Sequence, residues 1–185
     1  MGRMSESVRD AMIDAAWFLI AERGLEGMST REVLARTGAP RGSVYHHFPR
    51  GRAELIELAL DRSRQWMQDQ IAAIPARTAK DVTDGYLDIW RRVVEGAGFR
   101  AGCTMAGVTT GGPDPAMLDR AQAAFTATGE ALAARLEEVG VAGDEAAQRA
   151  MLLVIAAEGA VILARARRSS EPLTLVASQL GKLSW

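Results

Sequence analysis

The chain has 185 residues with a formal net charge of −1, and 48% of the residues are hydrophobic. This length suits one compact domain or two small ones sharing a helix, and the composition excludes both a disordered chain and a polycation. The single cysteine excludes an internal disulfide, which is typical of a protein from a reducing compartment.

Apolar residues recur at helical spacing from the start of the chain, and Gly24 ends the first predicted helix. Ser29 opens a second, short helix that runs to about residue 36, because it precedes Glu32 at the capping-box spacing. Gly38 is expected to end this helix, because glycine readily adopts the positive φ of a helix C-terminus. Pro40 is placed to be the first residue of a third helix, which ends near residue 48.

Longer helices follow. The pattern predicts one over residues 53–74, stopped by Pro75, and another from Thr78 to about residue 94. Residues 96–115 are glycine-rich and broken. Further helices are predicted over 116–139 and 144–168, and a last one from residue 171 carries Leu183 on its apolar face. We find no strand alternation, so the sequence predicts an all-α fold with eight or nine helices.

The second and third predicted helices, within residues 29–48, have the dimensions of a helix-turn-helix, whose second helix enters the DNA major groove. Residues 36–52 contain four arginines and both histidines but no carboxylate. This composition favours DNA binding, because phosphate neutralisation dominates affinity for DNA. Short helix pairs around a glycine turn also occur in unrelated proteins, so the spacing alone leaves a purely structural interpretation open.

The candidate DNA contacts divide by role. Residues 41–45 are candidates to read base edges, because arginine bonds bidentately to guanine and a tyrosine ring contacts the thymine methyl group. Residues 30 and 31 begin a helix whose N-terminus favours phosphate, and the remaining residues are expected to hold the backbone. His47 has a packing alternative against the first helix, and Tyr45 has a half-buried one. The set comprises Thr30, Arg31, Arg41, Gly42, Ser43, Tyr45, His46, His47, Arg50 and Arg52.

The stretch STREVLARTGAPRGSVYHHFPRGRAEL, residues 29–55, resembles the helix-turn-helix of TetR-family transcriptional regulators. Their pattern has a T-x-x-x-[IVL]-A helix, a G-[VA] turn and a G-[ST]-[LV]-Y-x-[HY]-F segment, and the match covers about residues 6–66. The inserted Gly51, and Arg52 in place of lysine, are consistent with the LmrA/YxaF-like branch. The resemblance implies DNA contacts from Thr30, Arg41, Ser43, Tyr45, His47 and Arg52.

Two domains are therefore expected: a DNA-binding domain over 6–66, and a helical ligand-binding and dimerisation domain over 67–185. Residues 150–164 are apolar nearly all round, so we expect a partner subunit to cover one side. A two-fold dimer would separate the recognition helices by roughly 34 Å and predicts a palindromic operator. The interface candidates are Ala156, Gly159, Ala160, Leu163, Leu173, Val176 and Leu180.

Methionines and aromatic residues in the middle of the chain are candidates to line an apolar effector pocket, with ordinary core packing as the alternative. Cys103 is either a redox sensor, with Arg100 nearby to favour the thiolate, or a buried thiol. Glu158 is either a counter-charge for a cationic ligand or a polar link across the dimer interface. The pocket candidates are Trp66, Met67, Trp90, Phe99, Cys103, Met105, Met117 and Phe125.

The resemblance implies that an effector bound in the second domain releases such a regulator from DNA. Together with the patterns above, it leads us to expect a homodimeric repressor that a small apolar effector releases from double-stranded operator DNA. No cofactor or metal is expected. An all-helical binding protein or enzyme is the alternative class, but both histidines lie in the DNA segment and no metal-ligand spacing or phosphate loop occurs. A regulator that senses redox state through Cys103 is a further alternative. We expect a cytoplasmic location and no membrane contact, because no signal core is found and the apolar run 150–164 is short and contains Glu158.

Overall fold

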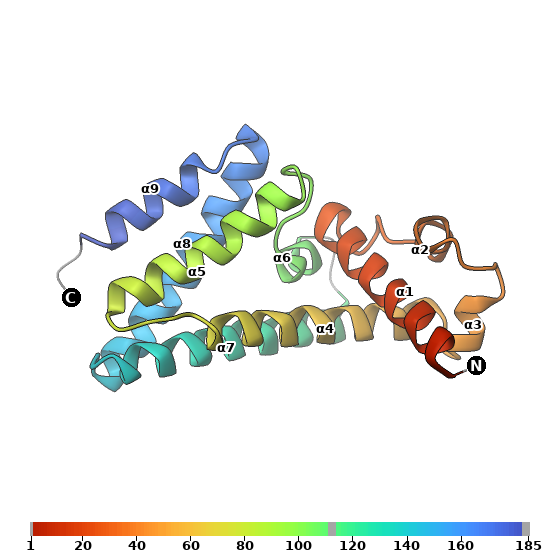
Figure 1. Cartoon of the computed structure of the whole chain (residues 1–185), viewed down its shortest axis with the longest axis horizontal. Coiled ribbons are helices and arrows are strands. Elements are labelled where there is room, and N and C mark those ends of the chain that lie inside the picture. Colours follow the sequence, from red (N-terminus) through yellow and green to blue (C-terminus); the bar gives the residue numbers. More distant parts are fainter. Residues whose placement is uncertain (1, 111–113, 183–185) are drawn as a thin grey trace.

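The computed structural model describes residues 2–110 and 114–182, and every regular element in these ranges is helical (Figure 1). The predicted all-α fold is thus confirmed. The helices are α1 (Gly2–Arg23), α2 (Thr30–Thr37), α3 (Ser43–His47), α4 (Arg52–Ala72), α5 (Ala79–Gly96), α6 (Thr104–Thr109), α7 (Pro115–Glu138), α8 (Gly143–Arg167) and α9 (Glu171–Leu180).

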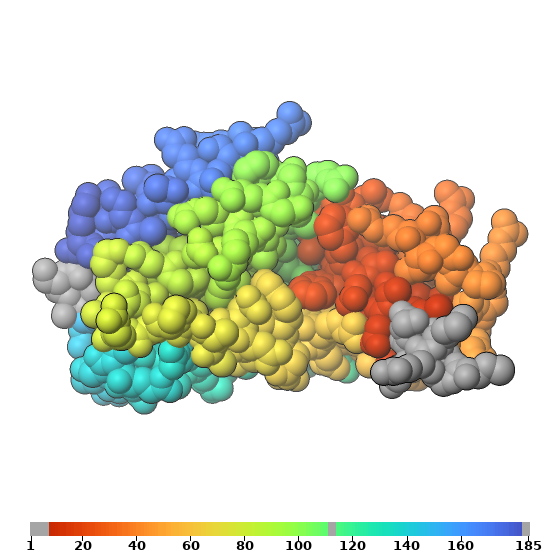
Figure 2. All heavy atoms as spheres, viewed as in Figure 1, coloured from red at the N-terminus to blue at the C-terminus, as the bar shows by residue number. Residues whose placement is uncertain are grey.

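The helices form an elongated molecule with distinct ends. Figure 1 shows α1, α2 and α3 gathered at one end and α9 at the other, while α4 and α7 run along its length. In the space-filling view of Figure 2, the orange segment that includes α2 and α3 forms the outer surface of its end of the molecule. The boundary expected after residue 66 falls inside α4, so this helix belongs to both units.

The first helices form where local signals place them. The Ser29 hydroxyl accepts a hydrogen bond from the Glu32 N–H at 3.2 Å and donates to the Glu32 carboxylate at 3.2 Å. Thr78 and Asp81 form the complete capping box at the start of α5. Gly38 has a φ of 67° and its N–H donates to the Leu34 carbonyl, which ends α2 as predicted.

Two boundaries and one additional helix differ from the sequence prediction. Helix α3 begins at Ser43, because Pro40 starts a turn in which its carbonyl accepts the Ser43 N–H at 2.9 Å. The glycine-rich segment contains α6, whose six residues are too few for helical periodicity to reveal. Helix α9 ends at Leu180, and Leu183 lies outside the described residues.

Helix α8 is the central helix of the second unit. It packs against α7, α9 and α5 and buries eight residues, most of them alanine or valine. It is 25 residues long, and by length and mean hydropathy alone it meets the requirement for crossing a membrane. The helix is therefore longer than the apolar run in the sequence. Helices α7, α9 and α5 cover one side of it, and its outer side is exposed.

Candidate nucleic-acid interface and internal cavity

Apolar side chains hold the α2–turn–α3 unit against the rest of the chain. Val33 from α2, Val44 from α3 and Phe48 just after α3 are buried in the core. The Arg9 guanidinium of α1 lies over the Phe48 ring, 5.4 Å from its centroid. Because Val44 faces inward, Tyr45 and His46, which follow it on α3, are turned toward solvent.

Helix α3 and the turn before it carry most of the predicted DNA contacts. Tyr45 is 74% exposed, which excludes the half-buried alternative for this side chain. Its ring covers Gly51, where a Cβ would lie 3.2 Å from the Tyr45 Cε1 atom. His47 is half-buried and makes edge contacts with the rings of His46 and Phe48. The remaining candidates are exposed at Arg31, Arg41, Gly42 and His46 and half-buried at Thr30 and Ser43.

The arginines of this surface differ in their contacts. Among the side chains that the structure describes, neither Arg31 nor Arg41 pairs with a carboxylate, and both are exposed. Arg50 makes two hydrogen bonds to the Glu57 carboxylate, at 3.0 and 2.7 Å, and this pairing raises the arginine pKa. Arg52 donates from Nε and Nη2 to the main-chain carbonyls of Met28 and Leu25. Arg50 and Arg52 are therefore engaged within the chain.

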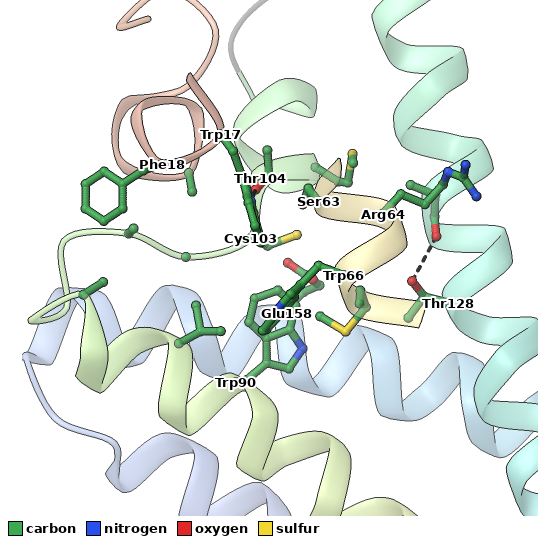
Figure 3. A pocket seen from close by; sticks show the side chains of 18 of the residues that line it. Trp17, Phe18, Ser63, Arg64, Trp66, Trp90, Cys103, Thr104, Thr128 and Glu158 are labelled. Atoms are coloured by element: carbon green, nitrogen blue, oxygen red, sulfur yellow. Dashed lines mark hydrogen bonds between the residues drawn. The ribbon is translucent and has the colours of Figure 1, made fainter. Parts of the chain in front are cut away.

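A cavity of about 460 Å³ lies among α1, α4, α5, α6, α7 and α8 (Figure 3). Six of the eight predicted pocket residues line it: Trp66, Met67, Trp90, Cys103, Met105 and Phe125. Phe99 and Met117 do not, although both pack against the core. Phe99 instead adopts a φ of 59° in the turn after α5, where its N–H donates to the Val94 carbonyl.

Part of the lining comes from α1, which the sequence assigned only to the DNA-binding unit. Trp17 and Phe18 of α1 face the cavity, and the Trp17 Nε1 donates to the Thr104 hydroxyl of α6 at 2.8 Å. The Trp17 and Trp66 rings lie 5.6 Å apart. Other lining residues that the sequence reasoning missed are Tyr86 and Thr128. Their helical spacing gives no signal that distinguishes a cavity wall from ordinary core.

Two titratable groups meet inside the cavity. Burial raises the pKa of the Glu158 carboxyl to about 7, against the lowering effect of a hydrogen bond with the Cys103 side chain, and the Glu158 Oε2 is buried without a hydrogen-bond partner. Burial and the neighbouring Glu158 raise the pKa of the Cys103 thiol well above its usual range. The Cys103 sulfur accepts a hydrogen bond from the Ala106 N–H at 3.4 Å, at the start of α6. A thiol in this environment stays protonated and is a poor nucleophile.

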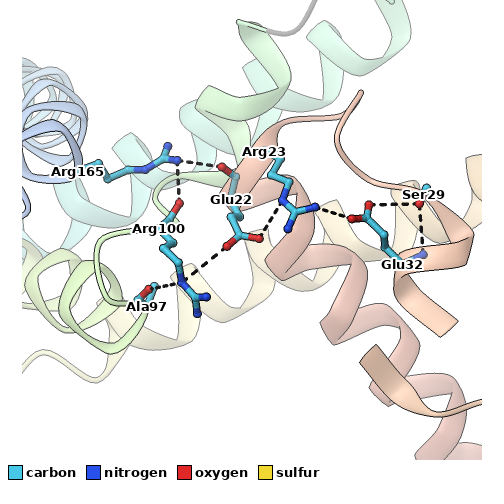
Figure 4. Close-up of polar contacts among 7 residues, drawn as sticks. All are labelled: Glu22, Arg23, Ser29, Glu32, Ala97, Arg100 and Arg165. Carbon is cyan, nitrogen blue, oxygen red and sulfur yellow. Dashed lines mark hydrogen bonds and ion pairs between the residues drawn. The ribbon is translucent and has the colours of Figure 1, made fainter. Parts of the chain in front are cut away.

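Helices α1 and α6 approach each other closely beside the cavity. A Cβ at Gly107 would lie 2.9 Å from the Ile20 carbonyl oxygen, and one at Gly24 would lie 3.1 Å from the Gly107 oxygen. Figure 4 shows how Arg165 of α8 reinforces this region by donating to the carbonyls of Glu22 and Arg100. The end of α1 is therefore joined to the segment before α6 and to α8.

The outer side of α8 and part of α9 form a further apolar surface, which we call the α8–α9 face. Gly159 and Leu163 lie on it and are exposed, and Ala156 is half-buried, whereas Val176 and Leu180 are half-buried and pack against the core. Ala160 and Leu173 are buried inside the chain, so they do not belong to the exposed face. The face also contains exposed residues that were not among the candidates: Met151, Leu152, Ile155, Ile162 and Leu175.

Comparison with known proteins defines the class of this chain. The family described as "Bacterial regulatory proteins, tetR family" matches residues 12–59, and "Transcriptional regulator LmrA/YxaF-like, C-terminal domain" matches residues 79–179. An HTH-type transcriptional regulator of Mycobacterium tuberculosis is 35% identical over 184 residues, covering 95% of this chain and 93% of the relative.

Solved structures have the same architecture. A TetR-family regulator from Agrobacterium tumefaciens superposes with a TM-score of 0.83 at 21% identity, covering 96% of this chain and 97% of that one. The regulator CifR, in complex with 26-base-pair double-strand operator DNA, gives a TM-score of 0.78 at 18% identity, covering 94% and 95%. The chain belongs to the TetR family of DNA-binding transcriptional regulators, not to a family of enzymes. Within that family it falls in the LmrA/YxaF-like branch.

Proposed function

We propose that this protein is a dimeric repressor that leaves a palindromic operator when a small, largely apolar effector binds its internal cavity. One observation carries the proposal: α1 and α4 each contribute both to the DNA-binding unit and to the cavity wall. An effector that prefers one arrangement of these helices therefore also favours one arrangement of the recognition helices.

The α8–α9 face supports the dimeric part of the proposal. Its exposed side chains are large and apolar, as at Ile155, Ile162 and Leu175, which are 61%, 58% and 59% exposed. An apolar surface of this kind is stabilised when a second copy covers it. Two-fold symmetry would then place two copies of α3 roughly one DNA turn apart, which suits a palindromic operator.

The exposed face of α3 supports direct DNA recognition, with residues 41–45 as candidates to read bases. Arg50 and Arg52 were expected from the sequence to contact phosphates. Their hydrogen bonds within the chain favour a role in stabilising the start of α4 instead. The redox-sensing alternative is not favoured, because Cys103 is buried and its thiol pKa is raised. A DNA-binding role also favours a cytoplasmic location.

The proposal is tested by fluorescence anisotropy on duplexes from the intergenic DNA beside the protein's own gene, at low and at physiological salt. We expect a salt-dependent complex on one inverted repeat, and protection of that repeat from nuclease. Absence of binding to this and to neighbouring intergenic DNA at low salt would refute DNA regulation. Protection of a single half-site would refute the dimeric arrangement.

A further inference from the structure

The internal cavity combines aromatic walls with one buried carboxyl group. Aromatic rings come from four helices, and the lining includes three of the four tryptophans of the chain: Trp17, Trp66 and Trp90. In Figure 3, Glu158 projects from α8 toward the middle of this lining. Its Oε2 is buried and has no hydrogen-bond partner. A carboxyl oxygen in this state is unusual in a folded interior and needs a physical explanation.

The other titratable and charged groups of the lining do not neutralise Glu158. Arg64 is exposed, and Figure 3 shows its side chain extending away from Glu158 along α7. The Asp14 carboxylate pairs with Arg62 at 2.8 Å. Burial raises the pKa of both the Tyr86 hydroxyl and the Cys103 thiol, so both groups are neutral at physiological pH. Among the described lining residues, Glu158 is thus the side chain in the interior of the cavity that can carry a charge.

The chemistry of this arrangement favours a positively charged occupant. A cation beside Glu158 would give its unpartnered oxygen an opposite charge and would stabilise the ionised carboxylate. Aromatic rings have negatively polarised faces that attract a cation within about 6 Å, most strongly for tryptophan. An anion would lie beside a carboxylate in a site with low water content, which opposes its binding.

We propose that the cavity binds a flat aromatic cation, with Glu158 as its counter-charge and the tryptophan rings of α1, α4 and α5 around it. The inference rests on the proposed role of the cavity as the effector site and specifies that the apolar effector carries one positive charge. It assigns Glu158 to ligand recognition rather than to a polar link between subunits. The cavity volume of about 460 Å³ accommodates a molecule of a few fused rings.

The test uses three probes with the same ring system and different charges: 10-methylacridinium, acridine and acridine-9-carboxylate. Isothermal titration calorimetry with the full-length protein at pH 8, without DNA, measures binding of the probes to the protein separately from operator binding. We expect the cation to bind at least about tenfold more tightly than acridine, and the anion to bind more weakly than both. The Glu158→Gln variant should reduce the preference for the cation to about twofold or less, while its affinity for acridine is unchanged.

Asp14→Asn is the matched control, because Asp14 is another carboxylate of the lining but pairs with Arg62. This variant should retain the preference for the cation. Equal affinity for the cation and acridine, a preference that survives Glu158→Gln, or absence of binding by all three probes would overturn the proposal. Because these titrations contain no DNA, their failure differs from a failure of operator binding, which the anisotropy assay measures separately.

Discussion

Three of the four arginines between residues 36 and 52 make contacts within the chain, each of a different kind. Arg36 lies over the Phe18 ring at 4.1 Å, Arg50 pairs with Glu57, and Arg52 binds main-chain carbonyls. Arg41 is exposed on the turn before α3. The positive charge of this segment is therefore not equally available to DNA, and Arg41 is the arginine with the freest approach to a base.

Arg41→Ala should weaken specific operator binding by about 1–3 kcal/mol if this guanidinium reads a base edge. Anisotropy titrations on the protected repeat and on a scrambled duplex measure the change. The exposed Arg167, at the end of α8, provides a charge-matched control, and Arg167→Ala should leave binding unchanged. Equal weakening on both duplexes would assign Arg41 to phosphate contact instead.

Glu158 makes stability depend on pH, because its pKa is about 7 in the folded chain and about 4.5 when exposed. Between pH 4.5 and 7 the Glu158 carboxyl is protonated in the folded chain but ionised in the unfolded chain. Its contribution to the free energy of unfolding is therefore complete below about pH 4.5 and is lost as the pH rises through 7. Glu158→Gln should therefore match the wild type near pH 4.5 and exceed it by roughly 2–3 kcal/mol at pH 8. Urea unfolding at both pH values measures this difference, and a constant difference would contradict the assigned burial.

At the scale of elements, the contact between α1 and α6 depends on two glycines. A Cβ at Gly107 would come within 2.9 Å of the Ile20 carbonyl, so Gly107→Ala must separate the helices. We expect a loss of about 1–3 kcal/mol in stability, measured by urea unfolding. Gly129→Ala in α7 is the control, because a Cβ there meets nothing within 4 Å and should be neutral or stabilising. Equal effects of the two substitutions would show that close approach is not the cause.

Local signals explain which elements the sequence predicted well. Ser29 caps the start of α2 and Gly38 ends it, and the two residues lie within ten positions of each other. Local interactions were therefore sufficient to predict this helix from the sequence. The cavity depends on contacts such as that between Trp17 and Thr104, which are 87 positions apart. No local pattern reveals such a contact, and for this reason Trp17 was missed and Phe99 was wrongly placed in the lining.

At the scale of the whole molecule, the α8–α9 face is the surface expected to join two copies. Gly159 lies on it, and a Cβ at this position meets nothing within 4 Å in the single chain. Gly159→Trp should therefore leave the chain folded but convert the dimer to a monomer, as measured by sedimentation equilibrium with circular dichroism as the check on folding. Ala134→Trp, on an exposed position of α7, should remain dimeric. A dimeric Gly159→Trp variant would place the interface elsewhere.

Trp17 donates a hydrogen bond inside the cavity from the same helix that packs the recognition unit. If occupancy of the cavity lowers affinity for the operator by some factor, thermodynamic reciprocity requires DNA to lower affinity for the effector by the same factor. Protein bound at an operator is then less sensitive to the effector than free protein. The effector concentration that induces transcription would accordingly be set by how tightly each operator holds the protein, so one regulator can give different thresholds at operators of different strength.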